Sequence, residues 1–184
     1  MALTLSNMME LGTKAPNFEL MDTVSRKTVV LADLKSEVAT VVFFICNHCP
    51  YVKHINAKMV EVANLYQAKG VKFVAISSND VETHPQDSPE MMKHVAEQQD
   101  YPFPYLYDET QAVAKAYRAE CTPDLFVFNA DLKCVYRGQF DNSRPNKGKP
   151  TGEDLSKALD AIIAGEEVST EQKPSMGCNI KWKK

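Results

Sequence analysis

The sequence lacks several features that would assign it to a broad class. No stretch of the 184 residues approaches the ~18 to 20 apolar residues of a membrane-spanning helix. Met1 to Leu11 holds neither a basic segment nor an apolar run of signal-peptide length. The net charge is -3 and the pI about 5.8, so no basic surplus favours nucleic acid or an anionic membrane as a partner. We therefore expect a cytoplasmic protein that binds neither nucleic acid nor a membrane.

Internal repeats, low-complexity tracts and a second CxxC are also missing. The chain is 44% hydrophobic and 24% charged, which is enough for one sizeable core and predicts a single domain over residues 1–184. Residues 166–184 have little periodicity, and we expect them to form an extended tail. In a reducing compartment the five cysteines are not expected to form a disulfide framework, so they are catalytic or act as small hydrophobic side chains.

One stretch is more specific than the rest. Residues 39–45 are rich in β-branched and aromatic side chains, which is typical of a buried strand. Two cysteines, Cys46 and Cys49, follow directly with two residues between them. Residues 51–69 contain no Gly or Pro and are apolar at helical spacing, with Gly70 at their end. The sequence therefore predicts a buried strand, a CxxC motif and a helix.

This placement has a chemical consequence for the two thiols. The first turn of a helix has unpaired backbone N–H groups and a partial positive charge, so a thiol there loses its proton more easily. We predict that Cys46 is the attacking sulfur and that Cys49 resolves the mixed disulfide by closing a bond with Cys46. His48 lies between them and, when protonated, would stabilise a neighbouring thiolate.

Two other interpretations of the CxxC motif remain open. A zinc site would need two further ligands, and only His48 and His54 lie nearby, with His48 wedged between the thiols. Two buried and inert cysteines are the other alternative. The strand before the motif and the helix after it favour a redox-active pair, without a cofactor or a bound metal.

The remaining pattern predicts an α/β protein. A strand, a long helix and a second strand form a βαβ unit, which should be parallel and right-handed. Ser88, followed by Pro89 and Glu90, indicates a helix start. Thr151 with Asp154 three residues later suggests a capping box for the last helix. The predicted elements are a hairpin over 15–22 and 28–31, a strand over 71–76, a helix over 88–100, a short strand over 103–107, a helix over 110–119, a hairpin over 125–129 and 133–137, and a helix over 151–165.

This layout resembles the thioredoxin fold, and in particular its redoxin (AhpC/TSA-like) branch together with the TlpA-type thiol–disulfide oxidoreductases. The resemblance covers about 12–164 and depends on three motifs: Ala15-Pro16-Asn17-Phe18, the block over 41–50, and Thr122-Pro123 before a strand. It implies a central mixed sheet flanked by helices, an N-terminal hairpin and an insertion over 77–107 after the second strand of the βαβ unit.

The resemblance also implies roles for residues outside the CxxC motif. In that family the proline at the position of Pro123 is cis and faces the CxxC, and the residue at Thr122 offers its backbone to a substrate sulfur or peptide. The implied partners are a disulfide-bearing protein or small-thiol substrate and a thioredoxin- or glutathione-type reductant. A histidine before the second cysteine, as at His48, resembles the oxidising periplasmic disulfide donors, which opposes the cytoplasmic expectation. The direction of electron flow stays open.

Two departures from family patterns define the alternatives. The buried acid that thioredoxin carries six residues before its first cysteine is Thr40 here, so its proton-transfer role is vacant or passes to a histidine or to water. Peroxiredoxins carry a PxxxTxxC pattern, and here Val42 and Cys46 replace its proline and threonine ahead of Cys49. A peroxiredoxin-like peroxidase is therefore the second hypothesis. A copper- or zinc-binding delivery protein of the same fold is the third.

The other three cysteines have less defined roles. Cys121 lies two residues before Pro123, and we interpret it as a small buried filler, although it could accept a disulfide from the active pair. Cys134 falls on a predicted terminal strand and is expected to be structural. Cys178 follows Gly177 in the tail. We hypothesise that Cys178 pairs with Cys121 or resolves the active site, with simple packing of a tail thiol as the alternative.

Overall fold

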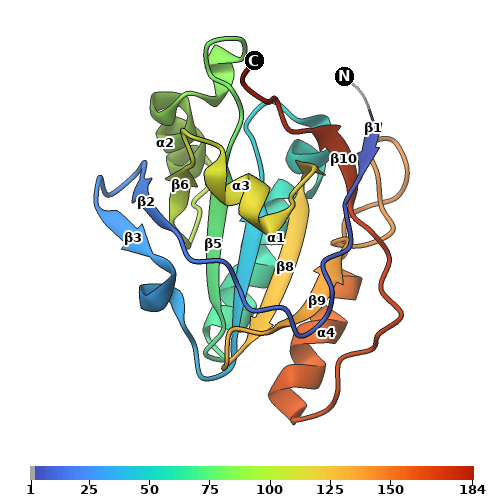
Figure 1. Ribbon diagram of the computed structural model, residues 1–184. Coiled ribbons are helices and arrows are strands. Elements are labelled where there is room, and N and C mark those ends of the chain that lie inside the picture. The colour runs from blue at the N-terminus through green and yellow to red at the C-terminus, as the bar shows by residue number, and fades with distance from the viewer. Residues whose placement is uncertain (1–2) are drawn as a thin grey trace.

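A computed structural model describes residues 3–184 and places a seven-stranded mixed sheet at the centre, in the order β3-β2-β6-β5-β4-β8-β9 (Figure 1). The helices are α1 (Pro50–Gln67), α2 (Pro89–Gln98), α3 (Ala112–Tyr117) and α4 (Glu153–Ala164), with 3-10 turns η1 (Leu31–Leu34) and η2 (Pro85–Asp87). The strands are β1 (Leu3–Leu5), β2 (Glu19–Asp22), β3 (Thr28–Val30), β4 (Ala39–Phe44), β5 (Lys72–Ser77), β6 (Tyr105–Tyr107), β7 (Cys121–Thr122), β8 (Asp124–Asn129), β9 (Cys134–Gly138) and β10 (Met176–Asn179).

The central strand β4 is buried on both faces, as its continuous apolar sequence predicts. Its alternate side chains divide the interior into two cores. Val41 and Phe43 join the core covered by α1, α2 and α4, whereas Val42 and Phe44 join the core covered by α3 and the N-terminal segment. In Figure 1, α3 and that segment lie on the near face of the sheet, and α1 lies behind it. The sheet therefore holds the end of β4 rigidly.

The strand pairing confirms the predicted layout. β4 is parallel to β5, which closes the βαβ unit with α1, and antiparallel to β8. The N-terminal hairpin pairs β2 with β3, and β8 pairs with β9 as the second hairpin. The insertion carries η2, α2 and β6, and β6 returns to the sheet beside β5. Over residues 3–184, none of the helices combines the length and the apolar character that crossing a bilayer requires.

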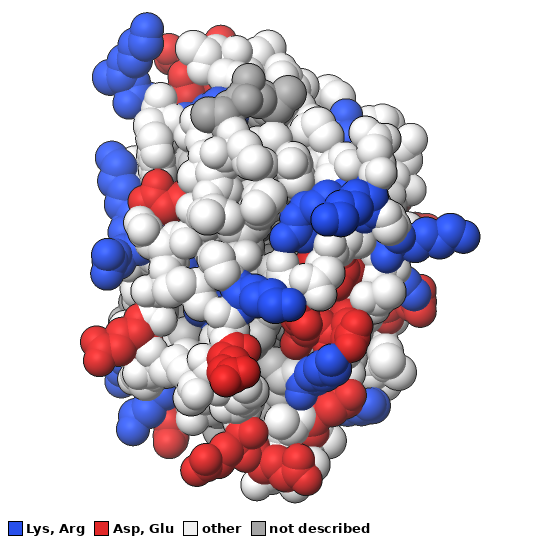
Figure 2. Space-filling model, turned by 90° about the vertical axis from the view of Figure 1, so that its right-hand side faces the viewer, with Lys and Arg blue, Asp and Glu red and all other residues white. Residues whose placement is uncertain are grey.

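The C-terminal segment, which we expected to form an extended tail, contains a short strand that the sequence did not predict. β10 is the middle strand of a small second sheet in the order β1-β10-β7. Its Gly177 lies so close to β7 that an added Cβ would be 2.0 Å from the carbonyl oxygen of Thr122. β10 has only four residues, so its alternation of side chains is too short to be recognised in the sequence. Its partners, β1 and β7, are also distant from it along the chain. On the side of the molecule seen in Figure 2, uncharged residues dominate the upper middle of the surface, and charges of both signs are mixed below.

Two predicted helix starts have different outcomes. Ser88 caps α2 as predicted, because its side chain accepts a hydrogen bond from the backbone N–H of Met91. The predicted capping box of α4 is wrong: its N-cap is Gly152, in a left-handed conformation with φ +68°. A carboxylate from elsewhere replaces the box, because Asp141 Oδ2 accepts from the backbone N–H groups of Thr151 at 2.7 Å and Gly152 at 2.8 Å.

Candidate active site

The CxxC motif lies where the central strand passes into the first long helix. β4 ends at Phe44, and Cys49 is the N-cap of α1, with Pro50 at the first helical position. Pro suits this position because the N–H that it lacks would have no helical partner. Cys46 and Cys49 are both buried, and their thiols are hydrogen-bonded to each other.

The sulfur of Cys49 has two polar neighbours besides Cys46. Its thiol donates to the carbonyl oxygen of Thr122 at 3.1 Å, and it lies 2.9 Å from Cys178 Sγ. The pKa of Cys49 is lowered to about 5 by hydrogen bonds, first from Cys46, then from Cys178, Thr122 and the backbone N–H of Val52, and burial acts against them. The Val52 N–H is one of the unpaired donors of the first helical turn. The neighbouring Cys46 thiol is therefore the main cause of the acidity of Cys49, and the first turn of the helix adds to it.

This result corrects the prediction that Cys46 is the acidified sulfur. The pKa of Cys46 is raised, because its proton is shared with Cys49, the thiol is buried and the charge of Asp87 lies nearby. Thr122 Oγ1, at 3.4 Å from Cys46 Sγ, acts in the opposite direction. The main physical reason is the contact between the two thiols, which lowers the pKa of Cys49 and raises that of Cys46. The backbone N–H of Val52, in the first turn of α1, adds to the effect on Cys49.

The intervening histidine contacts a buried acid that sequence reasoning missed. His48 Nδ1 lies 2.6 Å from Asp87 Oδ2 and 3.9 Å from Cys46 Sγ, so its stronger partner is the carboxylate. Among the described residues nothing hydrogen-bonds to the buried Nε2, and the ring stacks on His84 with centroids 5.2 Å apart. The predicted contact between His48 and the Cys46 sulfur is therefore present, but it is long, and the ring is held by Asp87.

Asp87 organises the loop between the two cysteines. Its Oδ1 accepts from the backbone N–H of Asn47 at 2.8 Å and of His48 at 3.3 Å, and its Oδ2 accepts from Asn79 Nδ2 at 2.8 Å. Burial tends to raise the pKa of Asp87, but the hydrogen bonds from His48, Asn79 and Asn47 hold it below its ordinary value. Thr40, at the position of the buried acid of thioredoxin, only donates to the Leu34 carbonyl at 2.7 Å. The acid near the pair comes from the insertion instead.

The sequence carried a partial signal for this acid. Polar residues directly after β5 are expected at the same sheet edge as the end of β4, since the two strands are parallel. This parallel pairing predicts that Asn79, just after β5, lies near the cysteines. It does not predict this for Asp87, which η2 brings to the site after a loop without a periodic pattern.

The Thr122–Pro123 peptide bond is cis, as the resemblance implies. Thr122 contacts both sulfurs, through Oγ1 to Cys46 and through its carbonyl to Cys49. Its backbone, however, already has a partner: Cys178 in β10 lies opposite Thr122 in the antiparallel pairing. The implied backbone contact with a substrate therefore stays a prediction, and in this structure β10 occupies the edge that would provide it.

The remaining cysteines separate into two kinds. Cys121 is buried, with its sulfur 3.6 Å from the carbonyl oxygen of Pro123, and burial raises its pKa. Cys134 in β9 is buried with its pKa raised to about 11, as suits a structural side chain. Cys178, in contrast, reaches Cys49 and not Cys121. The structure thus brings together Cys46, Cys49 and Cys178.

One group of metal-ligating side chains occurs within residues 3–184. The ligand atoms of Cys46, His48 and Asp87 lie within 4.8 Å of one another. The donors do not fit a metal centre well, since His48 Nδ1 is bonded to Asp87 and both carboxylate oxygens of Asp87 already accept hydrogen bonds. This arrangement is a histidine–carboxylate pair beside a thiol.

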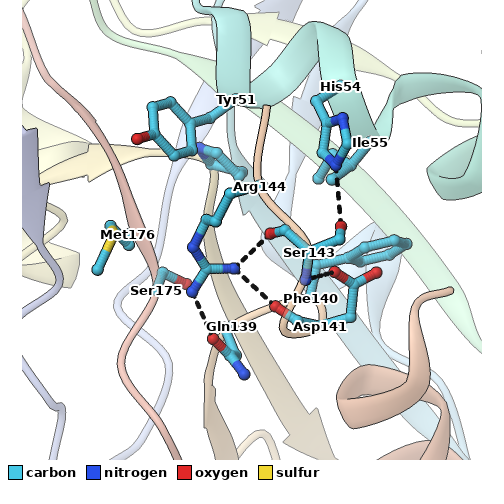
Figure 3. A pocket seen from close by; sticks show the side chains of 11 residues that line it. Tyr51, His54, Ile55, Gln139, Phe140, Asp141, Ser143, Arg144, Ser175 and Met176 are labelled. Carbon is cyan, nitrogen blue, oxygen red and sulfur yellow. Dashed lines mark hydrogen bonds between the residues drawn. The ribbon is translucent and has the colours of Figure 1, made fainter. Parts of the chain in front are cut away.

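A shallow hollow lies beside the cis proline (Figure 3). The guanidinium of Arg144 crosses it, donating to the carbonyl oxygens of Asp141 and Ser143 and to Gln139 Oε1. His54 Nε2 is 3.0 Å from Ser143 Oγ on the far wall. The hollow borders the pair without reaching either sulfur, and its lining residues are Tyr51, His54, Ile55, Pro123, Gln139, Phe140, Asp141, Ser143, Arg144, Ser175 and Met176.

Comparisons with known proteins agree with this geometry. A crystal structure of an uncharacterized conserved protein from Geobacillus kaustophilus is 60% identical, with a TM-score of 0.98 over 100% of this chain and 97% of that one. A protein named thiol-disulfide oxidoreductase ResA from Bacillus thuringiensis subsp. konkukian is 26% identical over 165 residues, which are 86% of this chain and 82% of its own.

A more distant structure bears on the fold alone. A putative thiol:disulfide interchange protein DsbE from Chlorobium tepidum is 20% identical and superposes with a TM-score of 0.67 over 85% of this chain and 99% of that one. The expected thioredoxin-like α/β fold is thereby confirmed. The family model named AhpC/TSA family matches residues 11–137, more than half of the chain. The chain belongs to the AhpC/TSA family.

Proposed function

We propose that this protein is a thiol–disulfide oxidoreductase, whose Cys46–Cys49 pair exchanges disulfides with a disulfide-bearing protein or a small thiol. One observation carries the proposal: an acidified thiol at the start of α1 lies against a second buried thiol, beside a cis proline. Stabilised thiolates are the reactive species in such exchange. The name of the ResA relative supports the same chemistry.

The reaction is a transfer of two electrons. Cys46 attacks one sulfur of the substrate disulfide and releases the other as a thiolate. Its proton passes to Cys49 along the hydrogen bond between the two thiols. Cys49 then attacks Cys46, which releases the second substrate thiol and leaves a Cys46–Cys49 disulfide. We assign the attacking role to Cys46, the first cysteine of the motif, because Cys49 Sγ is already in contact with the sulfur of Cys178 in β10. A thioredoxin- or glutathione-type reductant would restore the dithiol in a reducing cytoplasm.

The histidine–carboxylate pair adjusts the reactivity of Cys46. The charge of Asp87 contributes to the raised pKa of Cys46. A sulfur with a higher pKa is a stronger nucleophile once deprotonated, although less of it is ionised. His48 lies between Asp87 and Cys46 and offsets part of this charge when it is protonated.

Insulin reduction with dithiothreitol tests the proposal. We expect the Cys46→Ser variant to lose the activity and the Cys49→Ser variant to accumulate a mixed disulfide on Cys46. Cys134→Ser is the matched control, because Cys134 is buried in β9 away from the pair, and it should keep its activity. Full activity of Cys46→Ser would refute the assignment.

A peroxiredoxin-like peroxidase is the second candidate. Cys49 followed by Pro50 matches one end of the peroxiredoxin pattern, and the pKa of about 5 supplies a thiolate for peroxide. The groups that lower this pKa are thiols, Thr122 and a backbone N–H, and not an arginine. Peroxide consumption with a thiol reductant separates the candidates: consumption that is lost in Cys49→Ser and kept in Cys46→Ser would favour the peroxidase.

A further inference from the structure

A third sulfur lies in contact with the active pair. Cys178 Sγ is 2.9 Å from Cys49 Sγ, and Cys49 is also hydrogen-bonded to Cys46. Cys49 therefore forms the middle of a row of three thiols. Cys178 is only 4% exposed, so this contact belongs to the interior of the molecule.

Strand pairing fixes Cys178 in this place. In β10 it lies opposite Leu3 of β1 on one side and Thr122 of β7 on the other. The preceding Gly177 permits a backbone approach to Thr122 that a side chain would block. Ser175 adds two anchors, since its N–H donates to Ser6 Oγ at 3.0 Å and its hydroxyl donates to the Gly138 carbonyl at 2.7 Å. The cysteine thus faces the pair because the backbone around it is held.

We propose that Cys178 is a third redox thiol, which attacks Cys49 in the Cys46–Cys49 disulfide to form a Cys49–Cys178 disulfide and release Cys46. The proposal rests on the proposed function, since the substrate disulfide supplies the oxidising equivalents. The exchange itself is balanced: the Cys46–Cys49 bond breaks, the Cys49–Cys178 bond forms, and the proton of Cys178 passes to the leaving sulfur of Cys46. No electrons enter or leave the chain in this step.

The geometry suits this exchange better than any other pairing. A disulfide bond is about 2.05 Å long, so the two sulfurs need to approach by roughly 1 Å. The sulfurs of Cys121 and Cys134 have backbone carbonyls as their neighbours, at 3.6 Å and 3.7 Å. The product would join β10 to the start of α1. It would also return Cys46, beside Thr122 and His48, to the thiol state in which it can attack a second substrate.

Peptide mapping of the full chain tests the proposal. Trypsin leaves Cys46 and Cys49 together in the peptide 36–53, Cys178 in 158–181 and Cys121 in 119–133. The reduced protein is oxidised with a stoichiometric amount of diamide, quenched in acid, alkylated and digested without reduction. We expect 158–181 linked to 36–53 in the wild type and also in Cys46→Ser, where only Cys49 is left to form the link.

Variants make the outcome decisive. Cys49→Ser should lose the link, and Cys134→Ser should keep it. Recovery of 158–181 only in its alkylated form, in both the wild type and Cys46→Ser, would overturn the proposal. If the link is missing while the wild type still reduces insulin, the proposed function is supported and the redox role of Cys178 is refuted. If the link forms but insulin is not reduced, the disulfide between Cys49 and Cys178 is supported and the proposed function is refuted.

Discussion

Replacing Asp87 with asparagine should disturb both the stability of the fold and the chemistry of the pair. Four hydrogen bonds converge on its fully buried carboxylate, from the backbone of Asn47 and His48 and from the side chains of His48 and Asn79. Asn has one acceptor oxygen, so its amide would meet two of these donors. Each donor left unpaired costs ~1–3 kcal/mol, so we expect Asp87→Asn to lose roughly 3 kcal/mol of unfolding free energy.

The pH dependence of this loss identifies the charge as its cause. The pKa of Asp87 is depressed in the folded protein, so its contribution is present above the ordinary carboxyl pKa and is lost as the pH falls through the depressed value. The difference between wild type and Asp87→Asn should therefore shrink in acid. Removing the charge should also lower the pKa of Cys46, which Asp87 helps to raise.

Urea unfolding at several pH values measures the first effect, and the pH profile of alkylation in a Cys49→Ser background measures the second. The exposed Asp131→Asn in a surface turn is the control, with an expected change within about 0.5 kcal/mol. A loss below ~1 kcal/mol for Asp87→Asn, together with an unchanged alkylation profile, would refute the reasoning.

Two further variants test the surroundings of the site. Gly177→Ala places a Cβ 2.0 Å from the Thr122 carbonyl oxygen, so β10 should be displaced and Cys178 alkylated faster; in Gly165→Ala, where the Cβ meets nothing within 4 Å, Cys178 should stay protected. Asp124→Asn leaves the guanidinium of Arg137 buried without its 2.9 Å carboxylate partner, which should cost roughly 3–5 kcal/mol in urea unfolding. If Asp124→Asn lowers the free energy of unfolding by less than about 1 kcal/mol, water reaches the Asp124–Arg137 ion pair and the reasoning is contradicted.

The sequence was sufficient for the elements that have a long periodic pattern. β4, α1 and the βαβ unit follow from apolar spacing, and Ser88 was recognisable as a cap because its hydrogen-bond partner is local in the sequence. The features that sequence reasoning missed depend on distant partners. Asp141 replaces the capping box of α4 from ten residues away, and β10 exists only because β1 and β7 flank it.

The same distinction applies to the candidate site. The two CxxC cysteines and the cis proline could be recognised because each lies in a local motif. Asp87 could not, since a short 3-10 turn in an aperiodic loop brings it to the pair. The start of α1 was predicted to within one residue, but the sequence does not show which of the two neighbouring thiols holds the proton, and the acidified sulfur was therefore assigned to Cys46.

The acidified thiol also makes stability depend on pH. Cys49 has a pKa of about 5 in the fold and an ordinary thiol value when unfolded. A depressed pKa gives stability that is fully present above the unfolded value and is lost as the pH falls through about 5. Near neutral pH the contribution is roughly 2–3 kcal/mol. Cys49→Ser should therefore reduce the stability difference between neutral and acidic solutions.

Titration of the thiolate by its ultraviolet absorbance tests the central claim most directly. The fully reduced wild type should form one thiolate with a midpoint near 5. Cys46→Ser, which keeps a hydroxyl donor for the Cys49 sulfur, should retain this low-pH step, and Cys49→Ser should lose it. An ordinary alkaline midpoint in the wild type, or a low-pH step that persists in Cys49→Ser and vanishes in Cys46→Ser, would contradict the account.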